Sequence, residues 1–184
     1  MDLTSMVVDN FLANPDSVRS SALSSDFTTT GNYPGFRSSV SDAGYSNHIK
    51  EKLEKIIGHN IEWDSADTTK FQLCFETNTS WIHWDPTEWT GILYLTPNAP
   101  VDSGTAIYRY KKTDEFMYVD TDHTVDTDHE SWEVISYIGN VYNRLALFKG
   151  RTYHKSLRAG FGTDKYSARL TQTFFFKTKF KEQS

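Results

Sequence analysis

The sequence has a single cysteine, Cys74, among its 184 residues. One cysteine excludes an internal disulfide and suits a reducing compartment, and within an apolar run it is typical of a small core residue. Long apolar runs are also absent, since none approaches the ~18 residues that a membrane-spanning helix needs. The opening stretch MDLTSMVVDNFL lacks the basic and apolar segments of a signal peptide. We therefore expect a cytoplasmic protein that does not enter a membrane.

Positive charge is scarce as well. Lys and Arg number 19 against 24 Asp and Glu, which gives a formal net charge of -5. Proteins that bind nucleic-acid backbones need clustered Lys and Arg. The only basic cluster is KTKFKEQS at the C-terminus, which has the composition of a solvated tail. The charge pattern argues against a nucleic-acid partner.

Aromatic residues, in contrast, are plentiful: 5 Trp, 10 Tyr and 12 Phe make up 15% of the chain. Together with many threonines, this composition favours β structure. A length of 184 residues suits one substantial core. We expect a single domain over residues 1–184, with a helical N-terminal layer at 1–60 and a β core at 61–180.

Two helices are predicted in the N-terminal third. Asn14 stands at an N-cap position with Pro15 at the first helical position. A second helix is expected at 45–58, where apolar residues recur at helical spacing and Gly58 ends the pattern. Residues 28–39, TTTGNYPGFRSS, are dense in turn formers and predict a loop.

From residue 61 onward the hydrophobic period becomes that of strands. Apolar and β-branched runs alternate with turn residues, which predicts strands at 68–77, 90–97, 104–112, 133–139, 143–150, 151–159 and 169–180. Helices followed by a series of strands favour a helical layer packed on an antiparallel sandwich or jelly roll.

The segment 119–129, VDTDHTVDTDH, repeats one acidic unit almost in tandem. Alternating aspartates suggest a calcium loop, but an EF-hand needs Gly at its sixth position and Glu at its twelfth. Val125 and Ser131 occupy those positions when the count begins at Asp120. A solvated acidic loop is therefore the better interpretation, a substrate lid the next, and His123 and His129 are not expected to be ligands.

The motif that carries chemistry is Trp81-Ile-His-Trp-Asp-Pro86. In an extended chain His83 and Asp85 project from one face and Trp84 from the other. Two such residues are either metal ligands or half-buried polar residues at a strand end. A facial triad of two His and one carboxylate, which is typical of non-haem iron, needs a third ligand from elsewhere.

His154, on a predicted late strand, is the candidate third ligand, with a hydrogen-bonded core histidine as the alternative interpretation. His48 and His59 lie in or beside the predicted second helix and are poor candidates. In SARLTQTFFF, Arg169 and Thr171 share one face of a strand. A guanidinium next to a hydroxyl forms a clamp for a carboxylate, although a lone arginine also covers surface aromatics.

His-x-Asp, a distant His and then Arg-x-Thr is an order that resembles the Fe(II)/2-oxoglutarate-dependent oxygenases. The likeness implies a double-stranded β-helix, a jelly-roll core, with His83, Asp85 and His154 on Fe(II). It implies that Arg169, Thr171 and Tyr94 bind the distal carboxylate of 2-oxoglutarate. It also implies a dioxygenase that uses O2 to hydroxylate a C–H bond of a peptide, protein side chain or amino acid, releasing succinate and CO2.

Within this group, HWDPTEWTGILYLT resembles the prolyl-hydroxylase branch. The YPG-x-R segment and the NRLALFKG ending resemble largely uncharacterised bacterial and phage members. Two departures stand out. The interval from His154 to Arg169 is longer than usual, which makes Lys165 and Arg158 rival clamps, although Lys165 lies in a predicted turn. The tyrosine that often precedes His-x-Asp is missing.

The substrate is not specified by any motif. Trp84, Trp89 and Arg109, with Tyr108 and Trp132, are candidates to line an entrance, but each has the alternative of packing in the core or at its rim. Two other functions stay open: a cupin-type metalloprotein that does not use 2-oxoglutarate, and a metal-free jelly-roll binding module.

Overall fold

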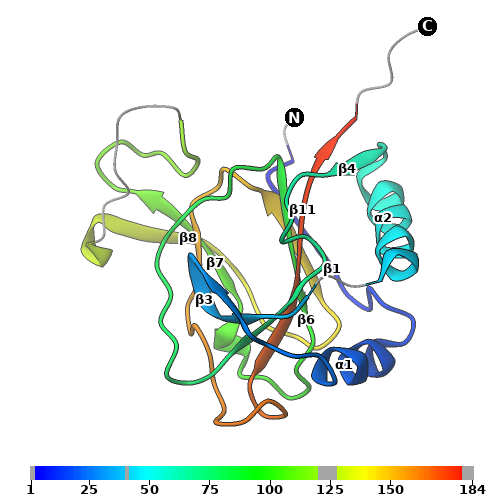
Figure 1. The fold of residues 1–184 in the computed structure, drawn as a ribbon. Coiled ribbons are helices and arrows are strands. Elements are labelled where there is room, and N and C mark those ends of the chain that lie inside the picture. Colours follow the sequence, from blue (N-terminus) through cyan, green and yellow to red (C-terminus); the bar gives the residue numbers. More distant parts are fainter. Residues whose placement is uncertain (1–2, 40–41, 120–127, 180–184) are drawn as a thin grey trace, which may run out of the picture.

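Two antiparallel sheets dominate the computed structural model, which describes residues 3–39, 42–119 and 128–179 (Figure 1). The larger has eight strands, in the order β1-β9-β6-β11-β5-β3-β2 with β4 paired to β11. Its strands are β1 (Ser5–Val8), β2 (Thr29–Gly31), β3 (Tyr33–Arg37), β4 (Ile61–Trp63), β5 (Phe71–Cys74), β6 (Trp89–Tyr94), β9 (Leu145–Lys149) and β11 (Arg169–Thr178).

The smaller sheet has three strands in the order β10-β7-β8. These are β10 (His154–Ser156), β7 (Thr105–Tyr110) and β8 (Trp132–Ile138), and two short 3-10 helices, η1 (Val101–Ser103) and η2 (His129–Ser131), precede β7 and β8. The protein is thus mainly β with N-terminal helices and a jelly-roll core, as predicted.

Both predicted helices form. In α1 (Pro15–Leu23) the Asn14 side chain accepts a hydrogen bond from Ser17 N, which confirms the predicted cap. The second helix, α2 (Ala43–Ile57), begins two residues earlier than predicted because Asp42 caps it, and it ends at Gly58 in the left-handed region. The two helices lie on one side of the large sheet (Figure 1).

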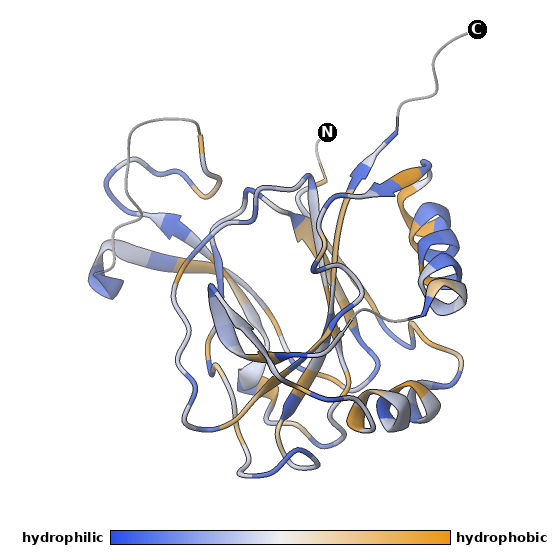
Figure 2. Ribbon diagram, viewed as in Figure 1, coloured by the Kyte–Doolittle hydropathy of each residue, from blue (hydrophilic) through white to orange (hydrophobic). Residues whose placement is uncertain are grey.

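Strand β11 separates the hydrophobic core from the site. Leu170, Phe174 and Phe176 belong to the main core cluster, which also contains Ile49 and Leu53 of α2. Apolar segments accordingly occur on the strands of the large sheet and on parts of both helices (Figure 2). Because side chains alternate along a strand, Arg169, Thr171 and Thr173 project from the opposite face and line an internal cavity.

The loop predicted at 28–39 is wrong, since these residues form the hairpin β2–β3. Strand β3 joins the large sheet through Phe36 and Arg37, which pair with Leu73 and Gln72 of β5. Gly35 makes this approach possible: its φ is +71°, and an added Cβ would lie 2.2 Å from the Leu73 carbonyl oxygen. The turn formers in this segment therefore shape an irregular strand.

The hairpin adds two strands to the helical layer expected at 1–60, and β1 is the short strand that the sequence VVDNFL predicts before the first helix. The predicted strand 151–159 is shorter than expected and covers only His154–Ser156. Most of the acidic repeat, residues 120–127, lies outside the described residues. That the whole chain forms one domain stays a prediction.

Candidate metal and cosubstrate site

His83 and His154 lie directly opposite each other on adjacent backbone segments. The His83 N–H donates to the His154 carbonyl at 3.1 Å, and the His154 N–H donates to the His83 carbonyl at 2.8 Å. This reciprocal pair brings the two imidazole rings to a centroid separation of 4.3 Å. The motif at 81–86 is thus joined to β10, at the edge of the small sheet.

Each histidine is oriented by a contact to its own segment. Nδ1 of His83 lies 3.0 Å from the Trp81 carbonyl oxygen, and Nδ1 of His154 lies 2.8 Å from that of Thr152. A carbonyl oxygen only accepts, so we assign the proton to Nδ1 in both rings and leave a lone pair on each Nε2. The protein therefore presents two free Nε2 atoms.

Both Nε2 atoms lie near the carboxylate of Asp85. Nε2 of His83 is 4.0 Å from Oδ1, and Nε2 of His154 is 3.4 Å from Oδ2. Possible ligand atoms of the three residues all lie within 4.8 Å of one another. In the part of the chain that the structure describes, this is the one such group of His, Cys, Asp or Glu.

The carboxylate of Asp85 is itself held in place. The Thr90 hydroxyl donates to Oδ2 at 2.6 Å, and the Asp85 backbone N–H donates to the Gly150 carbonyl at 2.8 Å. Trp84 projects to the other side of the segment, where its ring stacks on Tyr118 at a centroid distance of 4.1 Å. The alternation predicted for residues 83–85 is therefore present.

Burial keeps His154 in its neutral form. Its side chain is 4% exposed. Desolvation, followed by the effect of His83, lowers the pKa of His154 to about 4, although Asp85 acts in the opposite direction. A neutral imidazole is the form that binds a metal, so His154 is ready to act as a ligand at neutral pH. The donor set of two imidazoles and one carboxylate fits a non-haem Fe(II) centre.

A narrow inner cavity extends from these three residues to Arg169. Arg169 is 3% exposed, and its Nε donates to the Ser103 carbonyl at 2.9 Å. Its Nη2 is buried and has no hydrogen-bond partner among the residues that the structure describes. An unsatisfied buried donor costs about 1–3 kcal/mol. An anionic ligand in the cavity would remove that cost.

Thr171 lines the same cavity and is 1% exposed. Tyr94 is not among the lining residues. Its hydroxyl and the Thr105 hydroxyl are hydrogen-bonded at 2.8 Å, its ring centroid is 5.8 Å from Arg169 Cζ, and burial raises the pKa of its phenol. Thr105 does line the cavity, so the hydroxyl of Tyr94 reaches it through Thr105.

The two rival clamps lie elsewhere. Lys165 donates to the Leu23 carbonyl at 2.9 Å, and Arg158 is ion-paired with Asp102 at 2.7 Å with its side chain 49% exposed. Neither residue lines the inner cavity. His48 and His59 are exposed at α2 and just after it, as expected of residues without a site role.

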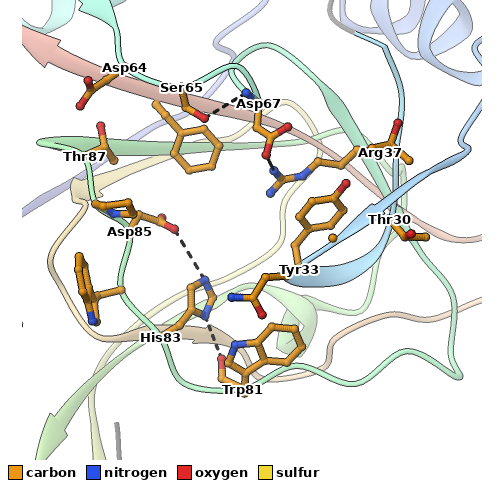
Figure 3. Close-up of a pocket in the computed structure, with 16 residues that line it drawn as sticks. Thr30, Tyr33, Arg37, Asp64, Ser65, Asp67, Trp81, His83, Asp85 and Thr87 are labelled. Atoms are coloured by element: carbon orange, nitrogen blue, oxygen red, sulfur yellow. Dashed lines mark hydrogen bonds and ion pairs between the residues drawn. The ribbon is translucent and has the colours of Figure 1, made fainter. Parts of the chain in front are cut away.

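A wider cavity of about 540 Å³ lies outside the His83, Asp85 and His154 group, and His83 and Asp85 line both cavities (Figure 3). Its walls come from the β2–β3 hairpin, the turn at 64–67 and the segment 81–87. Figure 3 shows Arg37 and Tyr33 on one side of this cavity and His83 and Asp85 on the other. We call it the outer cavity.

Of the predicted substrate residues, only Trp84 lines the outer cavity. Trp89 is buried against Phe176, and Arg109 is ion-paired with Asp114 and Glu133 at 2.9 Å and 2.6 Å. Tyr108 and Trp132 belong to a small core cluster. The structure therefore does not bring these four residues to either cavity.

The sequence analysis missed Tyr33 and Arg37, which line both cavities. Their segment, YPGFR, contains the turn formers Pro34 and Gly35, which favour a loop. No local periodicity reveals that β3 pairs with β5. Tyr33 of β3 lines the inner cavity, whereas no tyrosine directly precedes His-x-Asp in the sequence.

Solved structures with a similar fold are iron- and 2-oxoglutarate-dependent oxygenases. HygX from Streptomyces hygroscopicus, with nickel, 2-oxoglutarate and hygromycin B bound, has a TM-score of 0.65 at 12% identity over 96% of this chain and 84% of that one. A prolyl hydroxylase from Trichoplax adhaerens, in complex with a hypoxia-inducible-factor peptide fragment, has a TM-score of 0.56 at 13% identity over 94% and 83%.

A Pseudomonas putida prolyl-4-hydroxylase has a TM-score of 0.53 at 14% identity and covers 96% of this chain and 93% of its own. At these identities the likeness establishes a shared fold. The chain belongs to the family of unknown function DUF6445, whose model matches residues 3–126. The matched range contains His83 and Asp85 and ends before His154.

No curated protein sequence matches the chain. Across the described residues, no helix is long and apolar enough to cross a membrane. The narrower likeness to bacterial and phage members stays a prediction.

Proposed function

We propose that this protein is an Fe(II)- and 2-oxoglutarate-dependent dioxygenase. Nε2 of His83, Nε2 of His154 and a carboxylate oxygen of Asp85 would hold the ferrous ion. A ferrous ion with 2-oxoglutarate supplies the oxidising chemistry, in which O2, the cosubstrate and a substrate C–H bond yield succinate, CO2 and a hydroxylated product. The substrate that we propose is a peptide, a protein side chain or an amino-acid-like molecule.

The observation that carries the proposal is the unpartnered Nη2 of Arg169, buried in the cavity that also contains the His-Asp-His group. A buried guanidinium with a free donor suits a carboxylate, and the Thr171 hydroxyl on the same strand face adds a second donor. A cupin-type metal site alone has no use for this clamp. Arg169 thus favours a cosubstrate that binds the metal at one end and has a carboxylate at the other.

The remaining residues of the site orient and shield these groups. Thr90 fixes the Asp85 carboxylate through its hydrogen bond. The Phe148 ring packs on His154 at a centroid distance of 4.6 Å, and it keeps water away from that side of the imidazole. Thr105, held by Tyr94, adds a polar group to the cavity wall. None of these residues needs to act as a general base.

The test is an anaerobic titration of the protein with Fe(II) and 2-oxoglutarate, which requires no knowledge of the substrate. We expect the weak visible charge-transfer band of a chelated complex in the wild type. The band should be lost in Arg169→Gln at the same 2-oxoglutarate concentration, while Fe(II) still binds. Arg158→Gln, which removes a surface arginine, is the matched control and should behave as the wild type.

Two outcomes would contradict the proposal. Fe(II) binding without a band in the wild type would favour a metalloprotein that does not use 2-oxoglutarate. Absence of stoichiometric Fe(II) binding would favour a metal-free binding module on a jelly-roll scaffold.

A further inference from the structure

A second buried arginine faces the metal-ligand group. Arg37, at the end of β3, is 7% exposed and lines both the inner and the outer cavity. Figure 3 shows its guanidinium projecting into the outer cavity, across from Asp85 and His83. The proposed oxygenase needs one arginine for the distal carboxylate of its cosubstrate, and Arg169 meets that need. Arg37 has no role in that account.

The Arg37 guanidinium is rigidly held. Its Nε and Nη2 both donate to Gln72 Oε1 at 3.3 Å, and its Nη1 is ion-paired with Asp67 Oδ2 at 2.9 Å. Gln72 is fixed in turn, because its Nε2 donates to the Pro34 carbonyl at 2.7 Å. The guanidinium carbon also lies 3.8 Å from the centroid of the Tyr33 ring. A group held in this way loses little conformational freedom when it binds a ligand.

These contacts leave part of the guanidinium available. A guanidinium has five N–H donors, and two of them lie on each terminal nitrogen. The Nε–Nη2 edge is directed at Gln72, and Nη1 contacts Asp67. One hydrogen on each terminal nitrogen therefore has no partner among the described residues. A remaining N–H of a terminal nitrogen can donate a charge-assisted hydrogen bond to a carboxylate oxygen in the cavity.

One positive charge is in excess when the lysines paired with cavity aspartates are counted: Arg37, Arg169, Lys70 and Lys177 against Asp64, Asp67 and Asp85. Asp67 binds Lys70 at 2.6 Å as well as Arg37, so a single carboxylate serves two cations. Asp64, also on the outer cavity, has Lys177 at 3.6 Å. In the inner cavity two arginines accompany the single carboxylate of Asp85. The charges of a ferrous ion and of dianionic 2-oxoglutarate would cancel, so the excess positive charge would remain.

We propose that Arg37 binds a carboxylate of the primary substrate and so determines its class: a monoanionic carboxylic acid, such as an N-acylated amino acid or a peptide C-terminus. The single excess charge matches a carboxylate better than a phosphate dianion. This inference rests on the proposed function, because it treats Arg169 as the cosubstrate clamp. Arg37 then holds the substrate's carboxylate on the wall opposite the metal ligands.

The experiment uses full-length protein loaded with Zn(II), which does not support turnover, and with 2-oxoglutarate. The probes are N-acetyl amino acids, each paired with its C-terminal carboxamide, and binding is measured by ligand-observed NMR. We expect the acids to bind at least about tenfold more tightly than their amides, since a charge-assisted contact is lost in the amide. Arg37→Gln should abolish this preference and change 2-oxoglutarate affinity by less than about threefold.

Two further variants keep the test decisive. Lys70→Gln removes the other cation on Asp67 but lines neither cavity, so it should retain the preference for acids. Arg37→Lys keeps the positive charge but lacks the planar guanidinium donors, and it should retain a weaker preference for acids. This variant still tests the assignment if Arg37→Gln does not fold.

Three results would overturn the assignment of Arg37: no acid in the panel binds, acids and amides bind equally, or Arg37→Gln keeps the preference. Loss of 2-oxoglutarate binding in Arg37→Gln would also overturn it, because Arg37 would then hold the cosubstrate. Failure of the wild type itself to bind 2-oxoglutarate would instead contradict the proposed function. The same samples show this directly, because 2-oxoglutarate binding is measured in them as well.

Discussion

The two arginines of the site are supported by different kinds of structure. Arg169 lies in β11, which pairs with both β5 and β6, and its Nε donates to a backbone carbonyl. Arg37 lies at the end of a short hairpin strand, and its partners are the side chains of Gln72 and Asp67. Backbone pairing in the large sheet therefore positions Arg169 in the inner cavity. The position of Arg37 in the outer cavity depends on contacts between side chains. We therefore expect substitutions of Arg169 and substitutions of Arg37 to change ligand binding independently of each other.

The largest effect should come from substitutions in the group formed by His83, Asp85 and His154. His154→Ala removes a buried ligand and should lower Fe(II) affinity by more than the about 10–100-fold typical of outer-shell substitutions. The loss should extend to 2-oxoglutarate binding, because the cosubstrate is expected to bind the metal. Metal affinity is measured by anaerobic titration. His48→Ala, on the exposed surface of α2, is the control, and equal losses in both variants would contradict His154 as a ligand.

Removing the Arg169 guanidinium should weaken 2-oxoglutarate binding and leave Fe(II) binding nearly unchanged. In Arg169→Gln the 2-oxoglutarate dissociation constant should rise about 100-fold, since charge-assisted hydrogen bonds to a buried carboxylate contribute about 1.5–3 kcal/mol each. Fe(II) affinity should stay within about threefold of the wild type. Calorimetry in the presence of Zn(II) gives both values. If Arg37→Gln had the larger effect on 2-oxoglutarate, the assignment of the two arginines would be reversed.

A glycine substitution should disturb the β2–β3 hairpin, which lines both cavities. Gly35→Ala places a Cβ 2.2 Å from the Leu73 carbonyl oxygen at a φ of +71°, and we expect a loss of about 2–3 kcal/mol in unfolding free energy. Gly58→Ala is matched in φ, at +78°, but its Cβ meets no atom within 4 Å. It should cost about 1 kcal/mol. Equal losses by denaturant unfolding would show that β3 does not need its close approach to β5.

The smallest effect concerns the support of Asp85. Thr90→Val removes the 2.6 Å hydrogen bond to Oδ2 and should weaken Fe(II) binding about tenfold. Thr96→Val also removes a buried hydroxyl, which donates to the Ala168 carbonyl, but Thr96 lines neither cavity. It should lower stability without changing metal affinity. Metal binding by Thr90→Val that matches the wild type would exclude this supporting role.

The residues of β11 that line the inner cavity could be predicted from the sequence, because side chains alternate between the two faces of a strand. Arg169, Thr171 and Thr173 share one face of β11, as the alternation indicated. Trp89 and Arg109, the candidates to line an entrance, do not reach the cavities. Alternation places a residue on a face, but it does not say which part of a strand lies beside the site.

The outer cavity could not be predicted in the same way. Strand β3 makes only two register pairs with β5 and contains Pro34 and Gly35, so its sequence has the composition of a turn. The backbone pair between His83 and His154 is likewise set by the folding of distant segments. Local patterns do not report such tertiary pairings, and for this reason Tyr33 and Arg37 were missed.

The central claim is that the His-Asp-His group and Arg169 bind a metal ion and 2-oxoglutarate as one site. The most direct measurement is the calorimetric dissociation constant of 2-oxoglutarate for the wild type with and without Zn(II). We predict that the metal tightens 2-oxoglutarate binding at least about tenfold, and by linkage that 2-oxoglutarate tightens metal binding equally. A dissociation constant that does not depend on the metal, or no 2-oxoglutarate binding in its presence, would contradict the claim.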